Sequence, residues 1–440
     1  MGSQNAMRDA AGTAQLNKTG LPLQPDSIEE TGLGFLFLIE LLTKILFLRG
    51  QLRLLDLVQH SRLSVGVLEP LLAFMRTERL CEVTRSSETE TTTNYTLTEL
   101  GRLRAQDFLQ SSQYAGAAPV SLAAYVERVE QQSIHHMQIT RERLNDAFKG
   151  IVIRPTLLNQ IGAAMNSGRA IFIYGPAGNG KTFIAEHLSG LLNESVAVPH
   201  AIVVDNQVIQ VYDPLTHVVI HNGVENRDVT LDRRDMSDRR WLLCRRPVVK
   251  TGGELSLSML DLDFDESARF YQAPPQVKAN NGLLIIDDLG RQLTPAIDIM
   301  NRWIVPLDRK VDYLALHTGK KFTIPFDVIV VFSTNLPPSK LADDAFMRRL
   351  GYKIFVGPLD ETEYRAIAHQ VSDELGIPYS EEGIDFLLHE LHYKTGKPLT
   401  ACIPRDILEQ VRDFARYEQV EPVLSRDMLS WAWGNYFSHD

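Results

Sequence analysis

The stretch Gly175–Thr182 has the residue types and spacing needed to hold a chain of phosphates. It reads GPAGNGKT and fits the pattern G-x-x-x-x-G-K-[ST]. Its glycines let the backbone turn tightly enough for successive N–H groups to point at one anion. The run RAIFIY before it is typical of a buried strand, and TFIAEHLSGLL after it has apolar residues at helical spacing. We therefore predict a phosphate-binding loop between a strand and a helix, whose first N–H groups face the phosphates.

The residues of this loop have distinct predicted roles. Lys181 supplies a positive charge for the β- and γ-phosphates, and the hydroxyl of Thr182 is a ligand for Mg²⁺. The residues predicted to contact the nucleotide are Gly175, Pro176, Ala177, Gly178, Asn179, Gly180, Lys181 and Thr182.

A second apolar run ends in two carboxylates. Leu283–Leu289 reads LLIIDDL, which is typical of a buried parallel strand that presents Asp287 and Asp288 at its carboxyl end. Beside a phosphate-bound Mg²⁺, Asp287 is the predicted metal ligand, together with Thr182. Asp288 is predicted to polarise the attacking water.

Three later segments carry polar side chains that packing alone does not explain. Val328–Leu336 (VIVVFSTNL) is a further predicted buried strand, at whose end the amide of Asn335 could orient water or touch the γ-phosphate. Arg348 and Arg349 follow in AFMRR, and Arg405 stands at a predicted helix start in IPRDILEQV. These polar residues follow one another in a fixed order: a strand tip, an arginine pair and an arginine at a helix start. This order indicates a functional site.

From about residue 120 to residue 440 the chain resembles an AAA+ ATPase. GPAGNGKT is similar to Walker A, LLIIDD to Walker B, STN to sensor 1, AFMRR to the arginine-finger segment and PRD to sensor 2. The surrounding segments are most similar to the branch that contains MoxR-type and enhancer-activator ATPases. The resemblance implies an α/β fold, with a P-loop core built on a parallel sheet and an α-helical lid.

The same resemblance implies hydrolysis of ATP to ADP and phosphate, with Mg²⁺ bound. It implies Asp288, Asn335, Arg348 and Arg349 as catalytic residues, and Arg405 as the link between the γ-phosphate and the lid. An Arg348 or Arg349 from a neighbouring subunit would stabilise the transferring phosphoryl group. The chain is therefore expected to form a ring or helical oligomer, commonly a hexamer.

The sequence departs from the family pattern at the second carboxylate. The family usually has Glu after the Walker B Asp, whereas this chain has Asp288, which is one methylene shorter. A displacement of about 1 Å lowers rates on the order of 100-fold, so slow hydrolysis is one expectation. The activator-type loop GAFTGA is absent, which weighs against a transcription-activator role.

Composition restricts the class of protein. At 440 residues the chain is long enough for about two to four domains, and 44% hydrophobic with 23% charged residues is typical of a soluble globular protein. A net charge of −10 argues against a surface built as a whole for nucleic acid. The 3 cysteines lack metal spacing and suit a reducing cytoplasm. The most apolar run, Phe35–Leu48, contains Glu40 and Lys44, so we expect a buried helix and no membrane span.

We predict four regions along the chain. A disordered tail covers residues 1–29, and a small α+β winged-helix domain covers 30–112. The AAA+ nucleotide-binding domain covers 113–357, with an insertion at about 200–280, and the α-helical lid covers 358–440.

The winged helix-turn-helix pattern rests on three predicted helices, a two-stranded wing and a closing helix over Thr98–Leu109. The third helix, Val65–Glu78, has no Lys or Arg before Arg76 and carries Glu69 in its exposed first half. A helix that reads DNA normally has donors there. We therefore favour a protein partner, with DNA as the alternative.

The insertion allows two interpretations. Glu225–Lys250 mixes arginines with aspartates around Trp241, which is typical of a solvated, salt-bridged loop. The alternative is a surface that contacts a nucleotide, a polymer or a neighbouring subunit. Likewise, Phe270 and Tyr271 are either loop residues that face a pore or core residues.

Three functions are consistent with these features. The leading one is an ATP-driven oligomeric motor that remodels a protein partner selected by the winged helix. A second is a DNA-directed ATPase or regulator that uses the winged helix. A third is a nucleotide-gated scaffold in which Asp288 hydrolyses ATP slowly.

Overall fold

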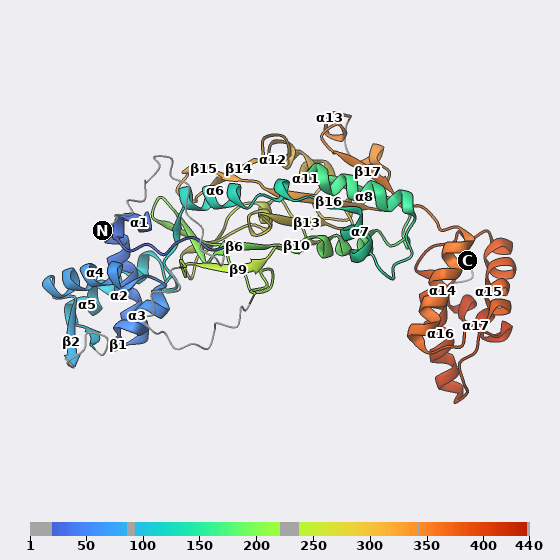
Figure 1. Ribbon diagram of the computed structural model, residues 1–440, viewed down its shortest axis with the longest axis horizontal. Helices are drawn as coiled ribbons and strands as arrows, with labels where there is room; N and C mark the ends of the chain where they lie inside the picture. Colours follow the sequence, from blue (N-terminus) through green and yellow to red (C-terminus); the bar gives the residue numbers. More distant parts are fainter. Residues whose placement is uncertain (1–19, 86–92, 221–236, 342–343, 438–440) are drawn as a thin grey trace, which may run out of the picture.

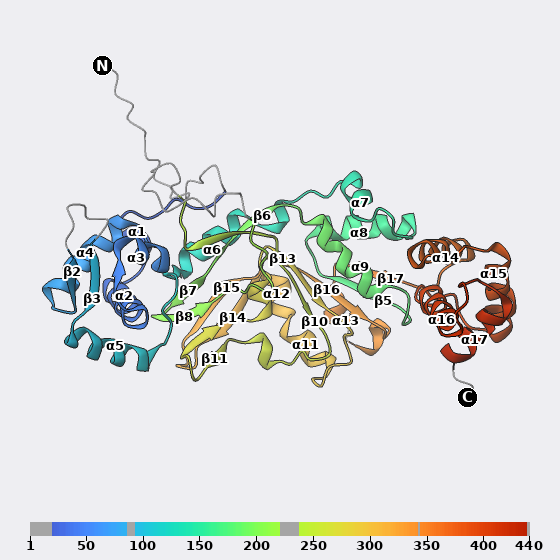
Figure 2. The same cartoon turned by 90° about the horizontal axis from the view of Figure 1, so that it is seen from below.

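The computed structural model describes residues 20–85, 93–220, 237–341 and 344–437. The molecule is elongated (Figure 1). The N-terminal helices lie at one end of the long axis, a parallel sheet lies in the middle, and the C-terminal helices lie at the other end. A view turned by 90° shows the same order (Figure 2).

Five parallel strands form the central sheet. In order across the sheet they are β10 (Val248–Thr251), β13 (Gly282–Ile286), β16 (Val328–Thr334), β5 (Ile171–Tyr174) and β17 (Tyr352–Phe355). Each neighbouring pair is parallel, so all carboxyl ends meet at one edge. The predicted mixed α/β fold with a parallel sheet and helices is confirmed.

Both faces of this sheet are covered, because successive strand residues point to opposite sides. Ile285 and Val331 pack in one core with helices α7 (Arg141–Ala147), α8 (Pro155–Ser167) and α9 (Lys181–His187). Ile286 and Phe332 pack on the other face with α11 (Ala296–Arg302), α12 (Ile304–Arg309) and Trp303. Every residue of β13 and β16 is buried, which explains why these strands read as continuous apolar runs.

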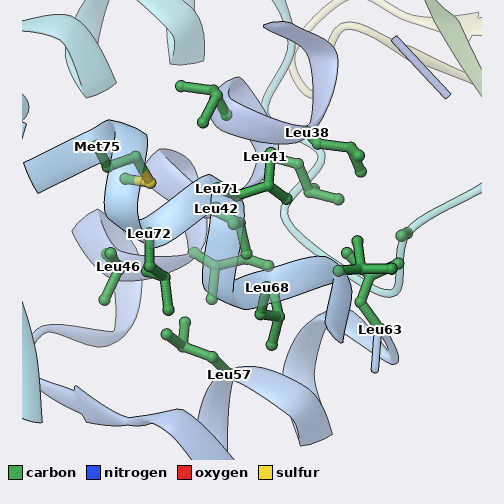
Figure 3. Close-up of a cluster of buried hydrophobic side chains, with 14 of the residues drawn as sticks. Leu38, Leu41, Leu42, Leu46, Leu57, Leu63, Leu68, Leu71, Leu72 and Met75 are labelled. Atoms are coloured by element: carbon green, nitrogen blue, oxygen red, sulfur yellow. The ribbon is translucent and has the colours of Figure 1, made fainter. Parts of the chain in front are cut away.

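The N-terminal helices enclose their own core (Figure 3). The elements are α1 (Ile28–Thr31), α2 (Phe35–Arg49), α3 (Leu54–Ser61), α4 (Val65–Thr77) and α5 (Glu99–Ser111), with the antiparallel strands β1 (Leu52–Arg53), β3 (Asn94–Leu97) and β2 (Cys81–Arg85). Leucines from α2, α3 and α4 meet in its centre. Helix α5 begins with a cap that sequence reasoning missed, since the Thr98 hydroxyl accepts a hydrogen bond from the N–H of Gly101 at 3.1 Å.

The predicted disordered tail over residues 1–29 is wrong for residues 20–29. Leu23 pairs with Ser237 as an isolated β-bridge, and the Pro25 carbonyl accepts a hydrogen bond from the Ser64 hydroxyl at 2.8 Å. The residues Ile28–Thr31 form α1, capped by Ser27. These long-range partners compensate for the low local preference of the segment, whereas residues 1–19 lie outside the described part.

The segment between β5 and β13 adds further strands. They are β6 (Ser195–Pro199), β7 (Ala201–Val204), β8 (Gln207–Gln210), β9 (Trp241–Arg245), β11 (Asp263–Asp265) and β12 (Phe270–Gln272). A second sheet has the order β11-β12-β8-β7-β4, where β4 is Val120–Ser121 and precedes α6 (Leu122–Gln131). The chain reverses at Asp205-Asn206: β7 and β8 pair antiparallel, and both turn residues have positive φ.

Arginines of the insertion have a role that neither predicted interpretation included. Arg240 is buried, and its guanidinium binds the Asp238 carboxylate at 2.9 Å and the Thr31 carbonyl at 3.0 Å. Arg246 is also buried, and it donates to the Asn281 carbonyl at 2.8 Å. These two arginines join distant segments of the chain, because a buried guanidinium requires partners for its donors. The predicted charges of residues 221–236 lie outside the described part.

The aromatic pair of the insertion belongs to the core. Tyr271 is 1% exposed, and Phe270 packs edge-on against Tyr114 with ring centroids 5.5 Å apart. Of the two predicted alternatives, the structure therefore supports the core position over a loop that faces a pore. Their packing joins the insertion to the N-terminal core, which also includes Ala201 and Val208.

The C-terminal helices share a separate core. They are α14 (Glu361–Leu375), α15 (Glu381–Asp385), a wider helical turn over Phe386–Tyr393, α16 (Ile403–Glu418) and α17 (Arg426–Tyr436). The remaining elements are α10 (Pro275–Lys278), the hairpin of β14 (Val311–Ala315) and β15 (Lys321–Pro325), and α13 (Asp344–Met347). In the described ranges, no helix combines the length and apolar composition that a membrane crossing requires.

Removal of Arg240 should destabilise the junction between the N-terminal core and the insertion. We expect Arg240→Ala to lower the free energy of unfolding by about 3–5 kcal/mol, because Asp238 is left buried without its partner. Urea denaturation followed by circular dichroism measures the change. The neighbouring Arg239→Ala is the matched control and should change it by less than about 0.5 kcal/mol. Equal denaturation midpoints for the two variants would contradict this account.

Candidate nucleotide site

The predicted phosphate loop lies between the end of β5 and the start of α9. Its Gly175 has φ 148°, and a Cβ there would lie 2.1 Å from the carbonyl oxygen of Val356. Gly178 has φ 81°, and a Cβ there would lie 2.7 Å from the sulfur of Cys402. Only glycine fits these positions, because both the backbone conformation and the close neighbours exclude a side chain. Gly180, with φ 78°, is the residue before the first turn of α9.

Lys181 is buried at the start of α9, where its ammonium donates a hydrogen bond to the Pro176 carbonyl at 2.8 Å. Burial lowers the pKa of Lys181, although the nearby carboxylates of Asp288 and Asp287 act to raise it. The loop therefore curls around the lysine, whose charge interacts with both predicted acidic residues.

Thr182 and Asp287 meet across the site. The Thr182 hydroxyl donates to Oδ1 of Asp287 at 3.0 Å, and the same oxygen accepts the N–H of Asp288 at 3.0 Å. A hydroxyl and a carboxylate are hard oxygen donors that suit Mg²⁺, which commonly takes its remaining ligands from phosphates and water. The pair therefore fits the predicted ion, and Thr182 and Asp287 are the residues that would hold it.

Lys250 is a neighbour of this pair that sequence reasoning missed. Lys250 belongs to β10, and its ammonium lies 3.5 Å from Oδ2 of Asp287 and 2.6 Å from Oε1 of Glu186. These contacts raise the pKa of Lys250, first through the hydrogen bond to Glu186. Lys250 thus partly neutralises Asp287, and only the pairing of β10 with β13 brings them together.

Asp288 and Asn335 also lie together, at the ends of neighbouring strands. Asp288 adopts φ 49°, a left-handed conformation that Asp tolerates better than most residues. Its Oδ1 accepts a hydrogen bond from the Asn335 amide at 3.1 Å. The loops that carry them are bonded to each other, since the Thr334 hydroxyl donates to the Leu289 carbonyl at 2.6 Å. Asn335 thereby orients the carboxylate of Asp288.

These residues line a cavity of about 920 Å³. One part of its wall is apolar and comes from the segment before β5 and from α14, namely Ile151, Val152, Ile153, Leu157, Ile367 and Val371. Another part is polar and contains the phosphate loop, Asp288 and Asn335. Apolar walls with a few placed polar groups are typical of ligand sites, and a nucleotide has a matching flat base and charged phosphates.

The C-terminal helices form one side of this cavity and contact the phosphate loop directly. The N–H of Cys402 donates to the Gly178 carbonyl at 2.9 Å. The Cys402 thiol lies 3.6 Å from the Thr400 hydroxyl and 3.6 Å from the Tyr436 hydroxyl. This contact was not predicted, because no local pattern relates residue 178 to residue 402.

The three predicted arginines occupy different places. Arg405 lines the cavity at the start of α16, where its guanidinium pairs with Glu374 of α14. Arg349 donates to Asp308 at 2.6 Å, and Arg348 is exposed just after α13. Neither Arg348 nor Arg349 is among the described residues that line the cavity. The fold therefore brings together the loop, both aspartates, Asn335 and Arg405, and leaves the arginine pair apart.

Cys402 offers a direct measurement of occupancy. Burial raises the pKa of the Cys81 thiol to about 11 and of the Cys244 thiol to about 12, whereas Cys402 is partly exposed at the cavity. Since the thiolate is the reacting form, we expect a maleimide to label the native chain at Cys402. Saturating ATP should slow this labelling several-fold by covering the cavity, as measured by mass spectrometry. Cys402→Ser is the control and should remove the signal. An unchanged labelling rate with ATP would contradict the assignment of this cavity to a nucleotide.

Comparison with known proteins yields little similarity in sequence. A family model described as a domain of unknown function (DUF8689) matches residues 360–435, and no curated protein matches. The chain is similar in structure to NtrX from Brucella abortus in complex with ADP, at 13% identity and a TM-score of 0.40, over 71% of this chain and 59% of that chain. It is also similar to the RuvB Holliday junction branch migration motor of Thermotoga maritima, at 13% identity and a TM-score of 0.36, over 70% of this chain and 74% of that chain. Both TM-scores lie below 0.5, so we infer function from the site itself.

Proposed function

We propose that this protein is an oligomeric AAA+ ATPase, which binds ATP with Mg²⁺ and hydrolyses it to remodel a protein partner. One observation carries the proposal. The phosphate loop, Asp287, Asp288 and Asn335 converge at one edge of the parallel sheet, beside an apolar wall that fits a base. Ligands bind at this edge in open α/β sheets.

Each group at the site has a task in the proposed reaction. The apolar wall holds the base, and the loop N–H groups with Lys181 hold the phosphates. Mg²⁺ would be held by Thr182 and Asp287, and when bound it would neutralise charge on the phosphates. Asp288 has one oxygen bonded to Asn335, which leaves the other oxygen to orient the attacking water and accept its proton.

The position of the arginine pair supports an oligomer. Arg348 is exposed and both arginines lie apart from the cavity of their own chain. A cation in such a position can complete the site of a neighbouring copy, where it would stabilise charge on the phosphoryl group. We therefore propose a ring or helical assembly, with a hexamer as the form that the family resemblance implies. We also propose a cytoplasmic location, which the 3 widely spaced cysteines suit.

The surface around α4 favours a protein partner over DNA. Residues 25 and 26 lie against the start of α4, where the Ser64 hydroxyl donates to the Pro25 carbonyl and a Cβ at Gly66 would lie 2.7 Å from the Asp26 carbonyl oxygen. Gly66 itself is exposed, and the first turn of α4 has no side-chain donor for a base edge. The first charged residue along α4 is Glu69, which is exposed. A recognition helix needs its first turn free and rich in donors to read base edges. We propose that this winged-helix surface selects a protein instead.

Substitutions at the site should separate binding from turnover. We expect Lys181→Ala to abolish ATP binding and Asp288→Asn to retain it while lowering the turnover number on the order of 100-fold or more. Binding is measured by calorimetry and turnover by phosphate release. The exposed Asp298→Asn is the matched control and should behave as the wild type. If the wild type binds ATP but its turnover equals that of Asp288→Asn, the protein is the nucleotide-gated scaffold instead.

Mixing of variants tests whether the arginines act between subunits. We expect Arg348→Ala/Arg349→Ala chains and Lys181→Ala chains each to be inactive alone. Their mixture should recover part of the turnover, because some interfaces join an intact loop to an intact arginine pair. Lack of recovery at every mixing ratio would contradict action on a neighbouring subunit.

A further inference from the structure

Arg291 is a cation of the cavity to which the proposed reaction assigns no role. It lies on the loop that follows Asp288, and its side chain lines the same cavity as Lys181 and Asn335. Burial is the main cause of the lowered pKa of Lys181, and the positive charge of Arg291 adds to it. Arg291 therefore belongs to the polar part of the wall, where the phosphates of a nucleotide would lie.

The loop that carries Arg291 is braced on the sheet. The N–H of Arg291 donates to the Asp288 carbonyl at 3.0 Å. The Gln292 amide donates to the carbonyls of Asp287 at 3.2 Å and Gly252 at 3.1 Å, and its oxygen accepts the N–H of Gly290 at 2.8 Å. These bonds tie the loop to the ends of β13 and β10. The backbone at Arg291 is thus held in place beside the carboxylates before any ligand binds.

Arg291 differs from the other two arginines of the cavity. Arg154 binds Glu363 at 2.7 Å, and Arg405 pairs with Glu374. Within the described ranges, the guanidinium of Arg291 has neither an ion pair nor a hydrogen bond. The nearby Asp288 carboxylate is instead bonded to Asn335. Arg291 is therefore available to an anion that enters the cavity.

Lys181 and Arg291 are two cations that line one cavity, and together they favour an anion there. Asp288 and Asn335 line the same cavity, and in the proposed reaction they act at the terminal phosphate. A guanidinium suits this position because its planar donors bind phosphate oxygens in pairs.

We propose that Arg291 binds the terminal phosphate of a nucleoside triphosphate bound to the same chain, and so makes the site prefer triphosphates over diphosphates. This inference rests on the proposed function, because it requires a nucleotide in the cavity. Arg291 acts within its own subunit, whereas the arginine pair acts on a neighbour. A diphosphate leaves Arg291 without its ligand.

Calorimetric titration tests the proposal with ADP and with the non-hydrolysable β,γ-imido analogue of ATP, each with Mg²⁺. We expect Arg291→Ala to weaken binding of the analogue on the order of 10- to 100-fold, because a charged hydrogen-bonded pair is lost. The affinity for ADP should stay within about twofold of the wild type. Arg291→Lys should give an intermediate loss, since it keeps the charge but not the paired donors. Arg104→Ala, which removes an exposed arginine of α5, is the matched control and should alter neither affinity.

The outcomes separate this inference from the proposed function. Unchanged preference for the analogue in Arg291→Ala, or equal loss for both nucleotides, overturns the role of Arg291 while the nucleotide site stands. Retained ADP affinity also shows that the variant is folded. A wild-type chain that binds neither nucleotide overturns the proposed function, and this inference with it.

Discussion

The hydrogen bond between Thr182 and Asp287 joins the two halves of the site, and the rest of the structure depends on the strand order that makes it. Thr182 starts α9 after β5, and Asp287 follows β13. Because β16 lies between these two strands, the tip that carries Asn335 is placed between the loop and the carboxylates. Parallel pairing brings all three to one edge. A shift of one residue in the register of β13 would turn its apolar side chains to the opposite core and move both aspartates.

The C-terminal helices complete the cavity without belonging to the sheet. Their core is separate, and they reach the phosphate loop through a backbone hydrogen bond from Cys402 to Gly178 at 2.9 Å. A second link is the ion pair of Arg154 with Glu363, across 2.7 Å. These two links are partly exposed, whereas the sheet itself is buried on both faces. In our proposal, this contrast would allow the helices to move relative to the sheet when a nucleotide enters or leaves.

The opposite end of the molecule is joined much more tightly. The N-terminal core continues into the insertion through Ala201, Val208 and Phe270, and Arg240 ties Thr31 to Asp238 from a buried position. Apolar contact and buried hydrogen bonds act together here. In our proposal, motions of the insertion would therefore be transmitted to a partner bound by the N-terminal helices, because packed side chains connect the two regions.

Local patterns were enough for the parts of the protein that are local in physical terms. The predicted phosphate loop depends on glycines at positions where the backbone conformation and close neighbours exclude a side chain, as at Gly175 and Gly178. The apolar runs before Asp287 and Asn335 could be predicted as buried strands, since a strand covered on both faces must be apolar throughout. The spacing of motifs also indicated which polar residues share the site.

Only the tertiary structure decided which residues far apart in sequence meet. Arg240 and Arg246 resembled surface charges in the sequence. No local pattern indicates that Arg240 donates to the Thr31 carbonyl and Arg246 to the Asn281 carbonyl. Phe270 and Tyr271 were ambiguous for the same reason. Lys250, Arg291 and Cys402 reach the site through strand pairing, a braced loop and a docked helix. The sequence by itself thus determined the chemistry of the predicted phosphate site, while long-range packing determined which charges surround it, which helices cover it and how it connects to the N-terminal helices.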